Sequence, residues 1–269
     1  MSFEKEYYEH EGFWDGDMLV DKKNSIRFQE TINLVPKDIN SLVDIGCGNG
    51  IFLNKLKQFG NIKTLLGIDR SSNALKYLQT ETLLSDINET QLPDNAYDCV
   101  TSLQVIEHLP IPQYNTALKE LTRISKKYVI IGVPYEEERE KAYTKCPSCL
   151  TIFNRDLHLR SYNLNDFKNL LNDYGYKNIK TRLEGESKIF YGHNLFISIF
   201  YPSQKKITFE SPICPICGYK KDMKKSVSKS HLSNNPKSFF STLKSIPKKI
   251  WPTKTKHYWI MGVFQKMNE

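Results

Sequence analysis

The stretch Ser41-Leu-Val-Asp-Ile-Gly-Cys-Gly-Asn-Gly50 decides the fold of this chain. It begins with an apolar run that only Asp44 interrupts, which is typical of a strand buried in a parallel sheet. It ends in glycines at alternate positions and leads into an apolar, helix-like segment from Ile51 to Phe59. A strand, a glycine turn and a helix in this order predict a concave backbone loop at the carboxyl edge of a sheet. Ligands of open α/β sheets bind at that edge.

The spacing of the glycines narrows the class of ligand. A dinucleotide-binding turn needs a third glycine where Ile51 stands, and the Gly-Lys-Ser/Thr ending of a phosphate-binding loop is absent. Asp44 precedes the glycines, and Asp69 closes the next apolar run. A carboxylate at the tip of the second strand can accept both ribose hydroxyls. Because no basic residue accompanies the glycines, the sequence favours a nucleoside without phosphates.

Together with four later segments, this turn resembles the class I S-adenosylmethionine-dependent methyltransferases. The four segments are Ser85 to Ile87, Tyr97 to Ser102, Gln104 to Leu109 and Lys127 to Pro134. The resemblance covers roughly residues 3 to 184 and a final strand near the C-terminus. It implies an α/β, Rossmann-like sheet of seven mostly parallel strands with the last one antiparallel. The alternative is a Rossmann-like domain that binds another nucleotide or lacks activity.

The resemblance also assigns cofactor contacts to single residues. It places Asp69 at the ribose and Asp86 near the adenine. Arg27 is expected to meet the methionine carboxylate, since an arginine fork suits that group, or else to be a surface residue. The full set of expected contacts is Asp44, Gly46, Cys47, Gly48, Asp69, Arg70, Asp86, Ile87, Gln104 and Arg27.

The first 36 residues are rich in aromatic side chains, and the resemblance implies that they fold over the cofactor as a helical lid. Tyr7, Tyr8 and Trp14 are candidates for the wall of the substrate pocket. The alternative is that these three side chains only pack the lid onto the sheet.

Glu107 and His108 directly follow the predicted fourth strand, at the edge where α/β sheets carry their chemistry. A histidine there could take the proton of a substrate hydroxyl. In ubiquinone-pathway O-methyltransferases a similar stretch has a glutamate where this chain has Gln104 and can hold a divalent ion, so the glutamine argues against a metal. We favour the alternative that Glu107 and His108 cap the next helix or order the loop around the cofactor, as in many members of the resembled family that use neither residue as a base. Because alignment of nucleophile, methyl group and sulfur supplies much of the rate enhancement, the catalytic residue is left open.

Four of the six cysteines form two Cys-x-x-Cys pairs, Cys146 with Cys149 and Cys214 with Cys217. Such turns point two thiolates at one ion, and two turns make a four-thiolate zinc site that is structural because it has no open position. The separation exceeds that of a compact zinc ribbon, so the chemistry rather than the spacing supports this prediction. Two unrelated surface pairs are the alternative.

His158 and Arg160 lie between the cysteine pairs, ahead of a helix expected from its N-cap Asn163 to its end at Gly175. The order Cys-x-x-Cys, Phe-Asn, His-x-Arg, helix and Gly-Tyr resembles methyltransferases of bacterial surface-polysaccharide pathways. The resemblance makes His158 a candidate base and Arg160 a candidate contact to an anionic group. Alternatively, both residues pack or solvate the loop beside the metal.

The chain is expected to divide into four parts. These are lid helices at 1–36, a cofactor-binding core at 37–184 whose loop 135–162 holds the first cysteine pair, an insertion at 185–256 with the second pair and a basic helix, and a final strand at 257–269. A length of 269 residues with 39% apolar content suffices for one α/β core with an appended element. Paired cysteines, and the lack of a leader pattern or a long apolar run, predict a cytoplasmic protein.

The formal net charge is +8, and the excess lysine lies mainly between Lys205 and Lys266. A basic amphipathic stretch from Phe239 to Trp251 could rest on the inner, anionic membrane face, or it could be an ordinary helix that closes the pocket. We therefore predict an O-methyltransferase of a sugar, nucleotide-sugar or lipid-linked glycan, with S-adenosylmethionine and structural zinc. An RNA methyltransferase that uses the basic tail, and a non-catalytic cofactor-binding partner subunit, are the alternatives.

Overall fold

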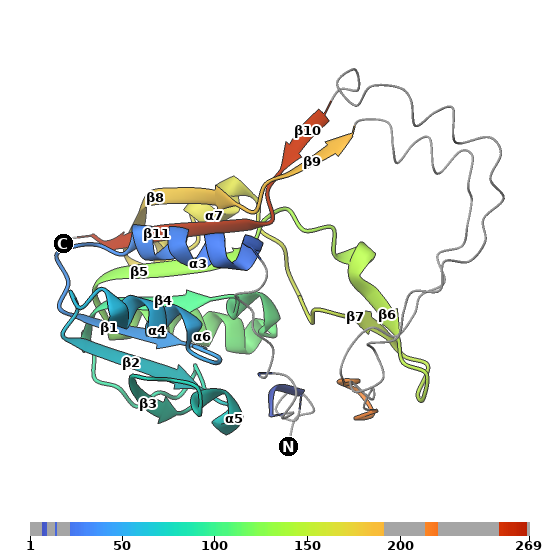
Figure 1. Cartoon of the computed structure of the whole chain (residues 1–269), viewed down its shortest axis with the longest axis horizontal. Coiled ribbons are helices and arrows are strands. Elements are labelled where there is room, and N and C mark those ends of the chain that lie inside the picture. The colour runs from blue at the N-terminus through green and yellow to red at the C-terminus, as the bar shows by residue number, and fades with distance from the viewer. Residues whose placement is uncertain (1–6, 10–13, 15–21, 191–212, 220–252, 268–269) are drawn as a thin grey trace.

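The computed structural model describes residues 7–9, 14, 22–190, 213–219 and 253–267 (Figure 1). Its centre is a seven-stranded sheet with the order β3-β2-β1-β4-β5-β11-β8. The strands are β1 Ser41–Ile45, β2 Thr64–Asp69, β3 Glu81–Leu84, β4 Tyr97–Leu103, β5 Ser125–Pro134, β8 Tyr176–Glu184 and β11 Trp259–Lys266. Strands β1 to β5 pair in parallel, whereas β11 runs antiparallel to both β5 and β8. The predicted Rossmann-like sheet with an antiparallel last strand is confirmed.

Strand β1 lies in the middle of the sheet and is covered on both faces. Leu42, Val43 and Ile45 are fully buried, and Asp44 is 2% exposed. Successive side chains of a strand point to opposite faces, so Leu42 joins one apolar cluster while Val43 and Ile45 join the other. A strand that is buried on both faces needs a continuous apolar run, whereas a half-buried strand alternates apolar and polar residues. The apolar run in the sequence therefore identified β1 as a central strand.

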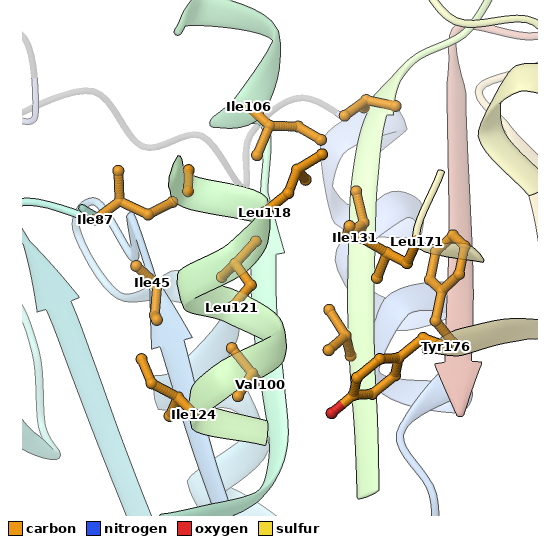
Figure 2. Packing of buried hydrophobic residues seen from close by; sticks show 14 of the residues in the cluster. Ile45, Ile87, Val100, Ile106, Leu118, Leu121, Ile124, Ile131, Leu171 and Tyr176 are labelled. Carbon is orange, nitrogen blue, oxygen red and sulfur yellow. The ribbon is translucent and has the colours of Figure 1, made fainter. Parts of the chain in front are cut away.

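Helices cover the two faces of the sheet (Figure 1). The helices with described bounds are α3 Lys22–Leu34, α4 Ile51–Gln58, α5 Ser72–Leu75, α6 Ile111–Ile124 and α7 Leu164–Lys168. Side chains of α3 and α4 share a cluster with Leu42, and those of α6 and α7 share the cluster of Ile45. Figure 2 shows Leu121 of α6 beside Ile45 of β1.

The segment between β5 and β8 contains more structure than the sequence predicted. The expected helix up to Gly175 is split into α7 and a 3-10 turn, η3 Asn172–Tyr174. Its predicted ends are in place, because the Asn163 side chain accepts a hydrogen bond from the Asp166 nitrogen at 2.9 Å and Gly175 has a φ of 78°. The expected polar loop 135–162 contains the 3-10 turn η2 Arg139–Ala142 and a hairpin of β6 Tyr143–Lys145 and β7 Ile152–Asn154.

The insertion is joined to the sheet by a two-stranded ribbon. Strand β9, Ser187–Phe190, pairs antiparallel with β10, Thr253–Lys256, and the two strands project away from the main sheet (Figure 1). The basic stretch from Phe239 to Trp251 lies outside the described residues. Among the helices that the structure describes, none combines the length and the apolar character needed to cross a membrane.

Candidate active site

The glycine turn after β1 is held against the tip of β2. Its glycines, Gly46, Gly48 and Gly50, have φ values of 77°, 54° and 71°, a region that disfavours other residues. The Gly46 nitrogen donates to the Ile68 carbonyl at 2.8 Å, and the Gly48 nitrogen donates to Oδ2 of Asp69 at 2.8 Å. The second strand therefore shapes the turn through its own backbone and through the carboxylate at its end.

Two carboxyl groups lie buried beneath this turn. Oδ1 of Asp44 accepts a hydrogen bond from the Thr101 hydroxyl at 2.6 Å, while Oδ1 of Asp69 accepts one from the Ser71 nitrogen at 2.9 Å. Burial raises the pKa of Asp44 to about 7, and it also raises the pKa of Asp69. A ligand that brings positive charge to this pair would favour the ionised carboxylates.

Residues of the N-terminal segment lie over the turn, where the sequence placed a lid. A Cβ atom on Gly48 would come within 2.8 Å of the Trp14 ring, and the Trp14 indole donates to the Tyr8 carbonyl at 2.6 Å. The ring of Tyr8 lies 6.2 Å from the ring of His108 and 5.4 Å from Cζ of Arg70, measured to ring centroids. Tyr7 is buried. These aromatic side chains thus link the glycine turn to the loop after β4.

Sequence reasoning missed Glu9, which anchors the same segment. Its carboxylate accepts hydrogen bonds from the Ser72 nitrogen at 2.8 Å and the Asn73 nitrogen at 3.3 Å, at the start of α5. Burial alone would raise the pKa of Glu9, but these hydrogen bonds outweigh burial and lower it. A single glutamate in an acidic stretch carries no pattern that would have identified this contact.

A polar centre lies at the carboxyl end of β4. We call Glu107, His108 and His158 the Glu-His centre; the first two belong to the 3-10 turn η1 Ile106–His108. Each residue offers one ligand-type atom, and these atoms lie within 4.8 Å of one another. The His108 and His158 rings are 4.8 Å apart, and Nδ1 of His158 lies 2.6 Å from Oε2 of Glu137. The sequence suggested both histidines as candidates but did not bring them together.

The surroundings set the charges of these groups. Burial raises the pKa of Glu107 to about 7 and lowers the pKa of His108 to about 3. Burial would also lower the pKa of His158, but the hydrogen bond with Glu137 and the nearby Glu107 raise it instead. A proton therefore resides on His158 in preference to His108, so His108 is the weaker base of the two.

Comparison with known proteins identifies the chemistry. Residues 43–131 match a family described as methyltransferase domain. The match covers the glycine turn, the acidic tip of β2 and the Glu107-His108 turn. The protein is an S-adenosylmethionine-dependent methyltransferase.

Curated relatives of this methyltransferase fall into two groups. An uncharacterized protein of Methanocaldococcus jannaschii is 28% identical over 79% of this chain and 84% of its own length. The ubiquinone biosynthesis O-methyltransferase of Saccharophagus degradans is 34% identical over 28% of this chain and 36% of its own length. The chain thus spans less than half the length of the ubiquinone biosynthesis enzymes that it matches.

Two solved methyltransferase structures share the fold of this chain over nine-tenths or more of its length. A methyltransferase from Archaeoglobus fulgidus has a TM-score of 0.52 and 18% identity, with 98% of both chains covered. One from Bacillus halodurans has a TM-score of 0.53 and 14% identity, and covers 90% of this chain and 99% of its own. These similarities establish a class I methyltransferase fold for the chain, including the antiparallel last strand.

The residues around the turn fit S-adenosylmethionine. The positive ammonium group of the cofactor suits the buried carboxylate of Asp44, and its ribose hydroxyls suit the carboxylate of Asp69. Asp86 at the end of β3 accepts hydrogen bonds from the Asn88 backbone and side chain, at 3.1 and 2.9 Å, and Ile87 beside it is buried. The structure therefore brings the predicted ribose and adenine contacts to one edge of the sheet.

A small cleft under α3 contains the other two predicted cofactor residues. Arg27 and Gln104 line it together with Phe28, Thr31, Leu103, Gly132 and Met261. Gln104 has a φ of 60°, and its buried Nε2 has no hydrogen-bond partner among the described residues. Cζ of Arg27 lies over the Phe28 and Trp259 rings, 4.7 and 5.1 Å from their centroids. Assignment of the methionine carboxylate to Arg27 stays a prediction.

Arg160 organises the turn that carries the Glu-His centre. Its guanidinium donates to the carbonyls of Ile106 and Leu109, and Cζ lies 4.0 Å from the centroid of the Tyr114 ring. These contacts give Arg160 a positioning role that the sequence did not predict. Its predicted contact to an anionic group of the substrate stays a prediction.

The two cysteine pairs of the methyltransferase converge. Sγ of Cys146 lies 3.7 Å from Sγ of Cys217, and Sγ of Cys149 lies 3.8 Å from Sγ of Cys214. A zinc ion with four sulfurs at about 2.3 Å has edges of about 3.8 Å between the sulfurs. All four thiols are unbridged and their sulfurs lie within 4.8 Å of one another, so they fit a tetrahedral ion. The predicted juxtaposition is present, and the identity of the ion stays a prediction.

Proposed function

We propose that this methyltransferase transfers the methyl group of S-adenosylmethionine to a hydroxyl oxygen of a sugar, a nucleotide-sugar or a lipid-linked glycan. The observation that supports oxygen is the Glu-His centre, which lies at the same sheet edge as the glycine turn and beneath Tyr8. A hydroxyl must lose its proton as the methyl group arrives, and such a centre serves that need. Similarity to ubiquinone biosynthesis O-methyltransferases, over 86 and 113 residues in two of them, agrees with this choice.

The support for a glycan acceptor is the segment between β5 and α7. It contains the order Cys-x-x-Cys, Phe-Asn and His-x-Arg that resembles methyltransferases of surface-polysaccharide pathways, and it supplies His158 to the centre. A lipid-linked glycan would bring the enzyme to an anionic membrane face, where the lysines between residues 239 and 251 would add attraction.

We also propose that the four cysteines hold one structural zinc ion. The ion would fasten the β6–β7 hairpin to residues 213–219, which lie far apart in the sequence. Because the hairpin and His158 belong to the same segment, the zinc would help to keep this segment in place. The four-sulfur site has no open position and takes no part in the transfer itself.

One experiment tests the acceptor class. The purified protein is incubated with methyl-labelled S-adenosylmethionine and separate polysaccharide, lipid, nucleic acid and protein fractions of a lysate. We expect label in the polysaccharide or lipid fraction, released by acid hydrolysis as an O-methyl sugar. The Asp69→Ala variant is the control with weakened cofactor binding, and it should incorporate less label at a limiting concentration of S-adenosylmethionine. Label in RNA would replace the glycan proposal by the RNA alternative, and no label despite intact cofactor binding would favour a non-catalytic partner subunit.

A further inference from the structure

Exposed apolar side chains gather on the two turns that carry the cysteine pairs. Of the fifteen large apolar side chains that are exposed in the described part of the chain, five lie in residues 143–152 and 213–219. They are Tyr143, Leu150, Ile152, Ile216 and Tyr219, and we call them the knuckle surface. Single exposed apolar residues are ordinary, but several on one small element mark a site of contact.

The knuckle surface is one structural unit. The four cysteine sulfurs lie within 4.8 Å of one another, so the two turns adjoin at some distance from the main sheet (Figure 1). In the β6–β7 hairpin Lys145 pairs with Ile152 and Thr144 with Phe153. Because successive residues of a strand point to opposite faces, Tyr143, Lys145 and Ile152 share the exposed face, while Thr144 is buried on the other.

Leu150 stands where the backbone favours glycine. The Leu150 nitrogen donates to the Cys146 carbonyl at 3.0 Å, just as the Gly218 nitrogen donates to the Cys214 carbonyl at 3.0 Å in the other turn. The two residues have φ values of 61° and 72°. This left-handed conformation crowds the Cβ atom of leucine and suits glycine. Leu150 is also 61% exposed, so neither the turn nor the packing of the fold accounts for a leucine here.

The charges that accompany the knuckle surface are mainly positive. Lys145 is the only charged residue of the β6–β7 hairpin, and residues 220–230, which follow directly in the sequence, contain five lysines and one aspartate. Glu138 precedes the hairpin, but its carboxylate pairs with Lys141 and Lys256. A partner with negative charge therefore complements this part of the chain.

The mixture of side chains suits a lipid bilayer better than a protein. Lysine is depleted from the core of protein–protein interfaces, whereas Lys145 lies directly opposite Ile152 on the exposed face. At a membrane surface, aliphatic side chains reach the acyl boundary while tyrosine and lysine stay at the level of the headgroups.

We propose that the knuckle surface docks on an anionic membrane and inserts Leu150, Ile152 and Ile216 into its headgroup layer. This inference rests on the proposed function, because a lipid-linked glycan is an acceptor that resides in a membrane. It assigns the contact with the bilayer to the cysteine turns, which the sequence expected only to staple the fold.

Docking there would bring the Glu-His centre to its acceptor. Strand β7 ends at Asn154, and the four residues from there to His158 span at most about 14 Å. The next residue is tied to the centre, because the Leu159 nitrogen donates to the Glu107 carbonyl at 2.8 Å. A hairpin held at the bilayer therefore keeps the centre close to the headgroups, where the sugar of a lipid-linked glycan lies.

Vesicle sedimentation of the full-length protein tests the proposal. We expect the wild type to bind vesicles of phosphatidylcholine with phosphatidylglycerol, and to bind phosphatidylcholine alone much more weakly. Leu150→Gly should lower the partition coefficient about tenfold, and adding Ile216→Ser should lower it about tenfold further. Lys145→Gln should lower it about fivefold through the loss of one charge. Phe59→Ser, which alters a side chain of similar exposure (52%) after α4, is the matched control and should bind like the wild type.

The design separates docking from folding. Leu150→Gly should unfold at no lower urea concentration than the wild type, because glycine suits the left-handed position. Metal content, measured on each variant, reports whether the cysteine turns are intact. Equal vesicle binding by the wild type and the folded Leu150→Gly, Ile216→Ser double variant overturns the proposal, and so does a wild type that binds no anionic vesicles.

Other occupants of the knuckle surface have their own signatures. Self-association in place of vesicle binding, lost in the double variant, would assign the surface to a second copy of the chain. RNA binding in place of vesicle binding would assign it to nucleic acid. Label in a glycan without vesicle binding would overturn the docking and leave the proposed function. Vesicle binding that the double variant loses, with no labelled glycan, would keep the docking and remove the proposed acceptor.

Discussion

Oδ2 of Asp69 accepts a hydrogen bond from the backbone nitrogen of Gly48 at 2.8 Å, so the acidic tip of β2 shapes the turn that receives the cofactor. Asp69→Ala removes this contact and the predicted ribose acceptor together. A hydrogen bond to a charged group contributes about 1.5 to 3 kcal/mol, so S-adenosylhomocysteine affinity should fall at least about tenfold by calorimetry. The exposed Asp173, changed to alanine, is the control. Unchanged affinity of Asp69→Ala would remove the ribose role.

Gly48→Ala tests the close approach of the lid to the turn. Gly48 has a φ of 54°, and an added Cβ would lie 2.8 Å from the Trp14 ring. We expect weaker S-adenosylhomocysteine binding by calorimetry, with part of the loss recovered in the Gly48→Ala, Trp14→Ala double variant. Gly60→Ala is the matched control, because Gly60 has a φ of 66° and no atom within 4 Å of its added Cβ. The Gly60→Ala substitution should lower the free energy of unfolding by about 1 kcal/mol and leave cofactor affinity unchanged.

Replacing a cysteine of either pair should lower the metal content. In Cys214→Ser and in Cys146→Ser, zinc measured by emission spectroscopy should fall by about one ion per chain, because a tetrahedral site loses one of its four sulfurs. Cobalt-loaded wild type should show the charge-transfer absorption of thiolate ligands. Cys47→Ser changes a cysteine of the glycine turn and should keep its zinc. A wild type that neither holds zinc nor shows thiolate–cobalt absorption would contradict the structural site.

Arg160→Lys separates positioning from substrate binding. A lysine cannot donate to the Ile106 and Leu109 carbonyls in the same forked geometry, so the free energy of unfolding should fall by about 1 to 3 kcal/mol in urea titrations. Arg182→Lys alters an exposed arginine and serves as the control. Unchanged stability together with a raised KM for the acceptor would favour the predicted anion contact over the positioning role.

Asp98 should make stability depend on pH. Burial alone would raise its pKa, but the hydrogen bond from the Asn40 nitrogen at 2.8 Å and the nearby Lys127 lower it below the ordinary value. The Asp98 carboxyl therefore binds a proton more readily in the unfolded chain than in the folded protein. The ionised carboxylate stabilises the folded protein fully above about pH 4, and this contribution is lost as the pH falls through the pKa of Asp98 in the folded state. We expect Asp98→Asn to be about 1 kcal/mol less stable than the wild type at pH 7.

The difference between Asp98→Asn and the wild type should shrink toward pH 3. Urea unfolding at several pH values measures it, and Asp173→Asn, with an exposed side chain, controls for the change in net charge. A difference that stays constant across this pH range would show that the ionised carboxylate is not the cause.

Local patterns in the sequence determined the elements that form the cofactor site. The apolar run with Asp44, the glycine turn and the acidic end of β2 depend on neighbours in the chain, because strand burial and positive φ are local requirements. The sixth strand, Tyr176–Glu184, has the predicted bounds, and Asn163 caps its helix as expected. The Cys-x-x-Cys pairs likewise predicted a shared four-thiol cluster, and the structure brings their sulfurs together, while the zinc ion stays a prediction.

Only the tertiary structure decided which distant groups meet. Cys149 and Cys214 are 65 residues apart, and His158 reaches Glu107 and His108 from the far side of a hairpin that the sequence did not predict. Contacts between residues so distant in the sequence depend on the path of the intervening chain. Hydrophobic periodicity and local secondary-structure propensity do not encode that path. The sequence therefore determined a cofactor turn with its carboxylates. The packing of the segment after β5 decided that Glu107, His108 and His158 form one centre, because it brings the imidazole of His158 to the buried carboxylate of Glu107 and the ring of His108.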